Sequence, residues 1–117
     1  MKTLYQEVAA RMRADVLSGA LPPGENLESI AALMRRYRTT KPTVQRACFL
    51  LEQERLLERQ DGVLVVSEDP VFLMQAREAM ARRAVRELYA MTRKMGLPDH
   101  RTVRIFLEEG GYDDAKG

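Results

Sequence analysis

The chain has 117 residues, of which 45% are hydrophobic and 31% charged, and its formal net charge is only +2. This length and composition predict one soluble globular core with a short addition, and they exclude a disordered chain. The sequence contains no membrane-spanning apolar run, no N-terminal signal peptide and only one cysteine, so we expect a cytoplasmic protein without an intramolecular disulfide.

The first expected element is an amphipathic helix that begins near Leu4 and ends near Ser18. Apolar residues recur at every fourth position from Leu4 to Val16, which is the spacing of one helical face. The segment 21–25 (Leu-Pro-Pro-Gly-Glu) then predicts a turn, because proline fixes φ and glycine supplies a positive φ.

Two short helices are expected next. Ser29 is a suitable N-cap for the first of them, and its apolar positions lie within 30–37 at helical spacing. Thr40 is the expected N-cap of the second, which has Pro42 in its first turn and apolar positions within 44–51.

These two helices also contain the strongest charge signal in the sequence. From Ser29 to Leu51 there is no aspartate or glutamate, while five basic residues occur: Arg35, Arg36, Arg38, Lys41 and Arg46. A surface that faces a polyanion benefits from cations and is weakened by carboxylates. The pattern therefore indicates nucleic-acid binding, although for Arg35 and Arg36 a solvated helix face is an equally good interpretation.

After Arg55, the β-prone runs 56–59 and 63–66 flank Gln60-Asp61-Gly62, and Asp-Gly is a strong hairpin signal. A helix pair followed by a hairpin predicts a winged helix-turn-helix domain over residues 1–69. The fold class is therefore mainly α with a small β-hairpin.

A long helix is expected from Pro70 to about Met95, followed by a short helix after Asp99. We interpret residues 70–109 as a helical dimerisation segment and residues 110–117 as a flexible tail. The alternative to a dimer is a fold in which the long helix packs against the winged helix of its own chain. The expected dimer contacts are Met74, Ala81, Val85, Leu88, Met91, Met95, Val103 and Phe106.

In a helix-turn-helix, the first residues of the second helix enter the major groove of DNA. Lys41 can donate to guanine, Gln45 can pair with adenine, and Thr43 can contact phosphate or a thymine methyl. The full set of expected DNA contacts is Ser29, Arg35, Arg36, Arg38, Thr40, Lys41, Pro42, Thr43, Gln45, Arg46, Gln60 and Gly62.

Other residue types argue against an enzyme or a metalloprotein. Cys48 and Tyr37 fall on apolar stripes and are expected in the core, and His100 is the only histidine. We therefore expect no catalytic residues, no metal and no cofactor.

Residues 4–66 resemble the winged-helix domain of GntR-type bacterial transcription regulators. The resemblance rests on 5–8 (Tyr-Gln-Glu-Val), 17–24 (Leu-Ser-Gly-Ala-Leu-Pro-Pro-Gly), 43–47 (Thr-Val-Gln-Arg-Ala) and the stretch from Leu51-Glu52 to 56–59. The long helix, the Gly96-Leu97 break and the short helix resemble the YtrA subfamily, whose C-terminal part is two dimerising helices.

The resemblance implies that Lys41 and Thr43 contact DNA and that Gly62 lies in the wing. It also implies an ABC-transporter operon as the regulated gene set. Three positions depart from the family pattern, namely Ala31 for an arginine, Arg38 for a glycine, and Asp61 for a lysine.

Together these features predict a sequence-specific DNA-binding regulator of the bacterial nucleoid, acting as a repressor and as a homodimer on an inverted-repeat operator. Its effector is unknown. The alternative is a winged-helix protein-interaction module without specific DNA binding.

Overall fold

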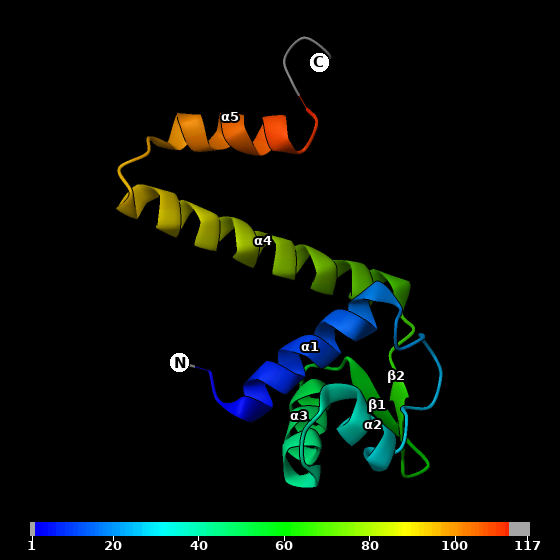
Figure 1. Ribbon diagram of the computed structural model, residues 1–117. Coiled ribbons are helices and arrows are strands. Elements are labelled where there is room, and N and C mark those ends of the chain that lie inside the picture. Colours follow the sequence, from blue (N-terminus) through cyan, green and yellow to red (C-terminus); the bar gives the residue numbers. More distant parts are fainter. Residues whose placement is uncertain (1, 113–117) are drawn as a thin grey trace. The chain divides into compact units, whose positions relative to one another are not determined.

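The computed structural model describes residues 2–112 and is mainly helical with one antiparallel hairpin (Figure 1). Its elements are α1 (Leu4–Ser18), α2 (Ile30–Tyr37), α3 (Lys41–Gln53), β1 (Leu57–Gln60), β2 (Val63–Val66), α4 (Pro70–Lys94) and α5 (Asp99–Glu109). This element order confirms the expected fold class.

The chain divides into two compact units between Ala76 and Arg77, whereas the sequence predicts that the winged helix-turn-helix domain ends at residue 69. The first turns of α4 account for the difference. Leu73 is 3% exposed and belongs to the core of the first unit, and Phe72 and Ala76 pack against that core. Burial of these side chains joins the start of α4 to the winged helix.

Local signals in the sequence set the ends of α1. The Thr3 hydroxyl accepts a hydrogen bond from the Gln6 backbone N–H, and the Gln6 side chain accepts one from the Thr3 N–H. This capping box satisfies two N–H groups that have no partner within the helix. At the other end, Gly19 has φ of 85° and stops the helix in the left-handed conformation.

The core of the first unit lies between α1, α3 and the hairpin. α1 contributes Met12 and Val16, which are both fully buried, and α3 contributes the apolar residues that its helical spacing predicted. The buried α3 residues are Val44, Ala47, Cys48 and Leu51. Because these four positions share one face of α3, the opposite face is left for solvent.

In the hairpin, β1 pairs antiparallel with β2, so that Leu57 lies opposite Val66 and Gln60 opposite Val63. Asp61 and Gly62 connect the strands with φ of 50° and 79°. Two positive φ values in a two-residue loop match the twist of the flanking strands, as the Asp-Gly pair predicted.

A third segment, which was not expected from the sequence, pairs with this sheet. Asn26 forms an isolated bridge with Val65, and the Leu27 N–H donates to the Leu64 carbonyl at 2.8 Å. This pairing extends the hairpin toward the start of α2. It could not be predicted from the sequence, because the segment has no alternation of apolar and polar residues.

In the second unit, α4 and α5 are joined by a short turn at Gly96, which has φ of 76°. The Leu97 N–H donates to the Thr92 carbonyl, and Arg93 forms a two-fold hydrogen-bonded ion pair with Asp99 across the turn. The two helices have the predicted positions. Most of the tail expected over 110–117 lies outside the described residues.

Candidate nucleic-acid interface

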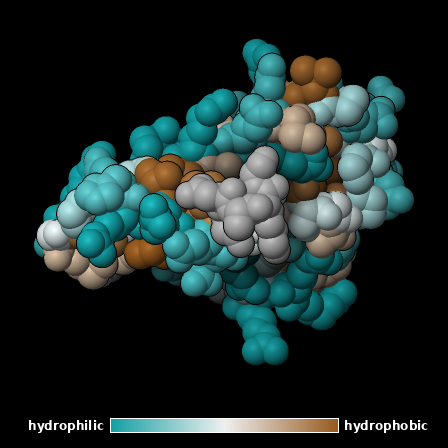
Figure 2. Space-filling view, turned by 90° about the horizontal axis from the view of Figure 1, so that it is seen from above, coloured by the Kyte–Doolittle hydropathy of each residue, from teal (hydrophilic) through white to brown (hydrophobic). Residues whose placement is uncertain are grey.

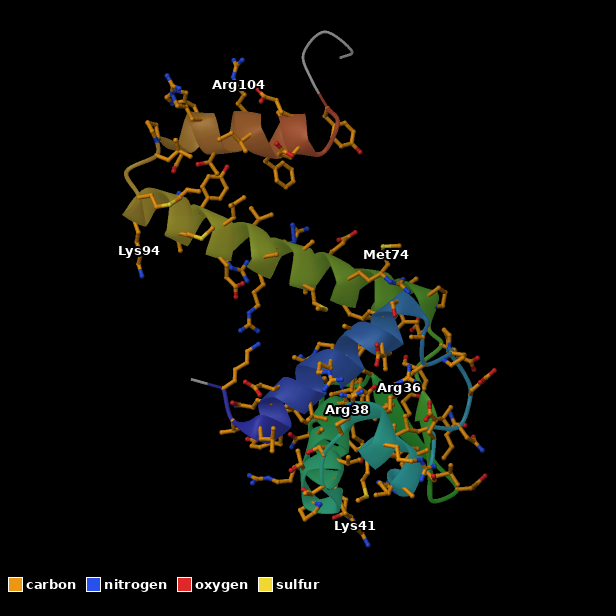
Figure 3. The ribbon with its side chains drawn as sticks, in the orientation of Figure 1. Arg36, Arg38, Lys41, Met74, Lys94 and Arg104 are labelled. Atoms are coloured by element: carbon orange, nitrogen blue, oxygen red, sulfur yellow. The ribbon has the colours of Figure 1, made fainter. Side chains whose placement is uncertain are left out.

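The first turns of α3 present polar side chains to solvent. Lys41, Pro42, Gln45 and Arg46 are exposed and Thr43 is half-buried. Lys41 projects away from the start of the helix (Figure 3). The expected reading end of α3 is therefore accessible, and no carboxylate lies in its first turn.

Thr40 is the N-cap of α3 as predicted, but its side chain does not cap the helix. Its hydroxyl instead pairs with the Thr43 hydroxyl at 3.1 Å. The first backbone N–H groups of α3 thus lack a side-chain acceptor. An anionic group such as phosphate can supply one at a helix N-terminus.

Arg38 forms the turn between α2 and α3 and has φ of 51° and ψ of 54°. This left-handed conformation is strained for a residue with a Cβ, by about 1 kcal/mol or more. Its N–H donates to the Met34 carbonyl and ends α2. The Arg38 side chain is exposed and has no carboxylate partner within residues 2–112.

The neighbouring arginines Arg35 and Arg36 differ in their surroundings. Arg36 forms ion pairs with Asp15 at 3.4 Å and with Glu28 at 2.8 Å, so its charge is largely compensated inside the protein. Arg35 is exposed and has no acidic partner among the described side chains. The two arginines therefore do not contribute equally to a positive surface.

Arg46 lies over the ring of Tyr5, with its guanidinium carbon 4.3 Å from the ring centre. This cation–π contact connects the second turn of α3 to the start of α1. It orients the guanidinium while leaving its positive charge uncompensated.

A groove of about 530 Å³ lies between the start of α2, the outer face of α3 and the wing. It brings together three predicted site residues from separate segments, namely Ser29, Gln45 and Gly62. The Ser29 hydroxyl accepts from the Ala32 N–H and caps α2 as expected. The groove thus connects α3 to the hairpin loop.

The wing contains one residue that the sequence analysis did not select. Arg59 contacts the Glu52 carboxylate at 3.3 Å and donates to the Gly62 carbonyl at 3.3 Å, so it fixes the hairpin loop against α3. Gln60 is exposed at the end of β1. The separation of Glu52 and Arg59 by seven residues gave no signal of their contact, because it depends on the turn between α3 and β1.

Tyr37 and Cys48 lie in the core, as predicted. The Tyr37 side chain is 3% exposed and that of Cys48 is 4% exposed. Burial raises the pKa of the Cys48 thiol to about 11, and the negative charge of Glu52 adds to this shift. The thiol is therefore protonated at neutral pH and is a poor nucleophile.

The predicted dimer contacts are mainly solvent-exposed in the single chain. Met74, Met91, Met95 and Phe106 are 51%, 55%, 68% and 53% exposed, whereas Leu88 is half-buried. The space-filling view shows hydrophobic side chains at the surface among hydrophilic ones (Figure 2). Exposed apolar area of this kind is typical of an association surface.

Within residues 2–112, no His, Cys, Asp and Glu side chains form a group of three that could hold a metal ion. No helix in the same part of the chain is long and apolar enough to cross a membrane.

Comparison with known proteins supports the interpretation of the first unit. The model of the family described as bacterial regulatory proteins, gntR family, matches residues 4–65. The Escherichia coli (strain K12) mannosyl-D-glycerate transport/metabolism system repressor MngR is 33% identical over 61 residues, which are 52% of this chain and 25% of that protein. The chain thus spans about a quarter of the length of this curated relative.

Solved structures show the same fold over most of the chain. A GntR family transcriptional regulator from Listeria monocytogenes aligns with a TM-score of 0.80 over 92% of this chain and 95% of its own, at 18% identity. The S. agalactiae protein BusR, in complex with its busAB-promotor DNA, aligns with a TM-score of 0.53 over 97% of this chain and 60% of its own, also at 18% identity.

Proposed function

Because the chain belongs to the GntR family of bacterial regulatory proteins, we propose that it is a transcription regulator that binds specific sequences in double-stranded DNA. The family consists of regulators and not of enzymes. The observation that carries the proposal is the exposed N-terminal end of α3, which has cations and hydrogen-bonding side chains and no carboxylate.

Lys41 and Gln45 are the proposed base-reading residues. They lie four residues apart on the exposed side of α3, so both side chains can reach one major groove. A lysine donates to guanine and a glutamine pairs with adenine. Thr40, Pro42 and Thr43 complete the helix end that approaches the DNA.

The backbone of the DNA would be held by Arg35, Arg38 and Arg46, and at the other side by the wing residues Gln60 and Gly62. Contacts to phosphate fix the register of a protein on DNA and supply much of its salt-dependent affinity. For Arg36 the ion pairs with Asp15 and Glu28 favour a structural role.

We further propose that two copies bind an inverted repeat and repress transcription by occupying it. A single reading helix covers only a few base pairs, and a two-fold dimer doubles the site. The exposed apolar side chains of α4 and α5 support self-association. MngR, the curated relative, is itself described as a repressor.

The pair of helices after the winged helix favours the YtrA subfamily within this family, and with it an ABC-transporter operon as the regulated target. A bacterial regulator of this kind would act in the cytoplasm at the nucleoid.

Selection of bound duplexes from a random DNA pool tests the proposal. We expect an enriched palindromic motif whose two halves are separated by about one helical turn or a multiple of it. If the pool shows no enrichment while the chain is folded and associated, the protein-interaction module becomes the better interpretation.

Size-exclusion chromatography with light scattering tests the dimer separately. The expected mass is near twice the chain mass of 13.4 kDa. A stable monomer at micromolar concentration would contradict the dimer without affecting the DNA-binding proposal.

A further inference from the structure

Phe49 is a large apolar side chain on the outer face of α3, and it is 60% exposed. Within residues 2–112, it is absent from the core of the first unit and from the partly buried apolar residues that pack against that core. The residues of α3 that are buried in this core are Val44, Ala47, Cys48 and Leu51. The phenyl ring therefore does not serve the packing of the first unit.

Phe49 lies on the same side of α3 as the two proposed base-reading residues. Lys41, Gln45 and Phe49 are spaced four residues apart, and residues at i, i+4 and i+8 share one face of a helix. Phe49 lies about 12 Å from Lys41 along the helix axis, which is about the width of the major groove. One groove can therefore hold both side chains.

Two grooves on the protein surface also place Phe49 beside Gln45. The groove of about 530 Å³ on the wing side of α3 is lined by both residues, and so is a groove of about 490 Å³ toward the start of α1. The ring is therefore continuous with the candidate DNA-binding surface.

The carboxylates that line the groove on the wing side are paired with arginines. Glu52 contacts Arg59 at 3.3 Å, and Glu28 contacts Arg36 at 2.8 Å. These ion pairs partly compensate the two negative charges, so the carboxylates repel phosphate less than unpaired ones would. A duplex can therefore approach the surface beside Phe49.

An apolar side chain at this position has one suitable partner on a base edge. Thymine presents its C5-methyl group in the major groove, and a phenyl ring can pack against that methyl group. Phosphate oxygens and the other polar atoms of the groove instead require hydrogen-bond donors, acceptors or cations, which a phenyl ring does not supply.

We propose that Phe49 is a further specificity-determining residue, which contacts the C5-methyl group of one thymine in each half-site of the operator. The inference rests on the proposed DNA-binding function. It adds an apolar base contact to the polar ones proposed for Lys41 and Gln45, and it assigns a role to a residue that the charge pattern of the sequence did not select.

Replacement of single thymines by deoxyuridine in the selected operator tests the contact, because deoxyuridine lacks only the C5-methyl group. Fluorescence anisotropy titrations of the full chain with these duplexes measure the affinity. We expect one thymine in each half-site at which the replacement weakens binding of the natural chain about fourfold, as for the loss of one buried methyl group. At that position, the replacement should leave the affinity of Phe49→Ala unchanged.

Val71→Ala is the matched control, because Val71 is 65% exposed in the same unit but lies on α4 and not on α3. This variant should keep the full effect of deoxyuridine. Phe49→Ala should bind the thymine operator more weakly than the natural chain does. The slope of its log affinity against log salt should be unchanged, since no charge is removed.

The inference is overturned if no deoxyuridine replacement weakens binding of the natural chain, a measurement that needs no variant. It is also overturned if Phe49→Ala is as sensitive to every replacement as the natural chain. Both results leave the DNA-binding proposal intact, because the selected operator is still bound. If the selection enriches no duplex at all, the DNA-binding proposal fails and this inference fails with it.

Discussion

The phenolic hydroxyl of Tyr37 donates a 2.7 Å hydrogen bond to the carboxylate of Asp15. This bond connects the last residue of α2 to α1, and Arg36 contacts the same carboxylate. Burial raises the pKa of Tyr37, and the bond to Asp15 raises it further, so the phenol remains a donor throughout the physiological pH range. Together with the buried Leu33 side chain, this contact holds α2 against the core of the first unit.

Tyr37→Phe should therefore lower the free energy of unfolding by about 1–2 kcal/mol, because a hydrogen bond to a charged group is lost from a largely buried site. Urea denaturation followed by circular dichroism measures the change. Tyr112→Phe is the control, since Tyr112 is 72% exposed. Equal stability of the two variants would show that the Tyr37–Asp15 bond contributes nothing.

Lys41→Ala and Gln45→Ala should each raise the free energy of binding to the selected operator by about 1–3 kcal/mol and relax specificity at one position of each half-site. Electrophoretic mobility shifts with operators mutated at single positions measure both effects. Gln53→Ala, at the end of the same helix, is the matched control. If Gln53→Ala weakens binding as much as Gln45→Ala, the N-terminal end of α3 is not the reading surface.

Arg35 and Arg36 should respond differently to alanine. Arg35→Ala should weaken binding to all duplexes alike and reduce the slope of log affinity against log salt by about one, as for the loss of one phosphate contact. Arg36→Ala should lower stability by about 1 kcal/mol or less, because its partly exposed ion pairs are screened by solvent. Affinity measured over a salt series, together with urea denaturation, separates the two roles. If Arg36→Ala instead weakens binding to all duplexes and Arg35→Ala does not, then Arg36 leaves its carboxylate partners to contact DNA.

Arg38→Gly should stabilise the fold by about 1 kcal/mol, because glycine adopts a φ of 51° without steric strain. Arg38→Ala retains the Cβ and should give no such gain. Both variants remove the same positive charge and should weaken DNA binding equally. Denaturation midpoints that do not differ between the two variants would mean that the turn carries no strain.

Alkaline pH should destabilise the protein through Cys48. Between its ordinary pKa of 9.0 and its folded pKa of about 11, the unfolded thiol loses its proton while the folded thiol keeps it. The unfolded state then binds fewer protons, so the free energy of unfolding falls as pH rises through this window. Urea titrations from pH 8 to about 11 should show a shallower decline for Cys48→Ala than for the natural chain. If the free energy of unfolding declines equally for the two proteins, Cys48 is not the cause of the alkaline destabilisation.

Local sequence determined the elements of this protein. Apolar residues at helical spacing gave α1, α2 and α3, Asp61-Gly62 gave the hairpin turn, and the acid-free stretch from Ser29 to Leu51 gave the candidate DNA-binding surface. These features depend on neighbours within a few residues of one another, so the periodicity and the turn chemistry of the chain are enough to recognise them.

Only the tertiary structure decided which arginines pair with carboxylates and where the chain divides into two units. Arg35 and Arg36 are adjacent in the sequence, but Arg36 alone reaches Asp15 and Glu28 on other segments. Likewise, Leu73 joins the first unit because the chain brings it against that core. The pairing of Asn26 with Val65 arises in the same way. Contacts between residues distant in sequence depend on how whole helices pack, and no local pattern encodes that packing.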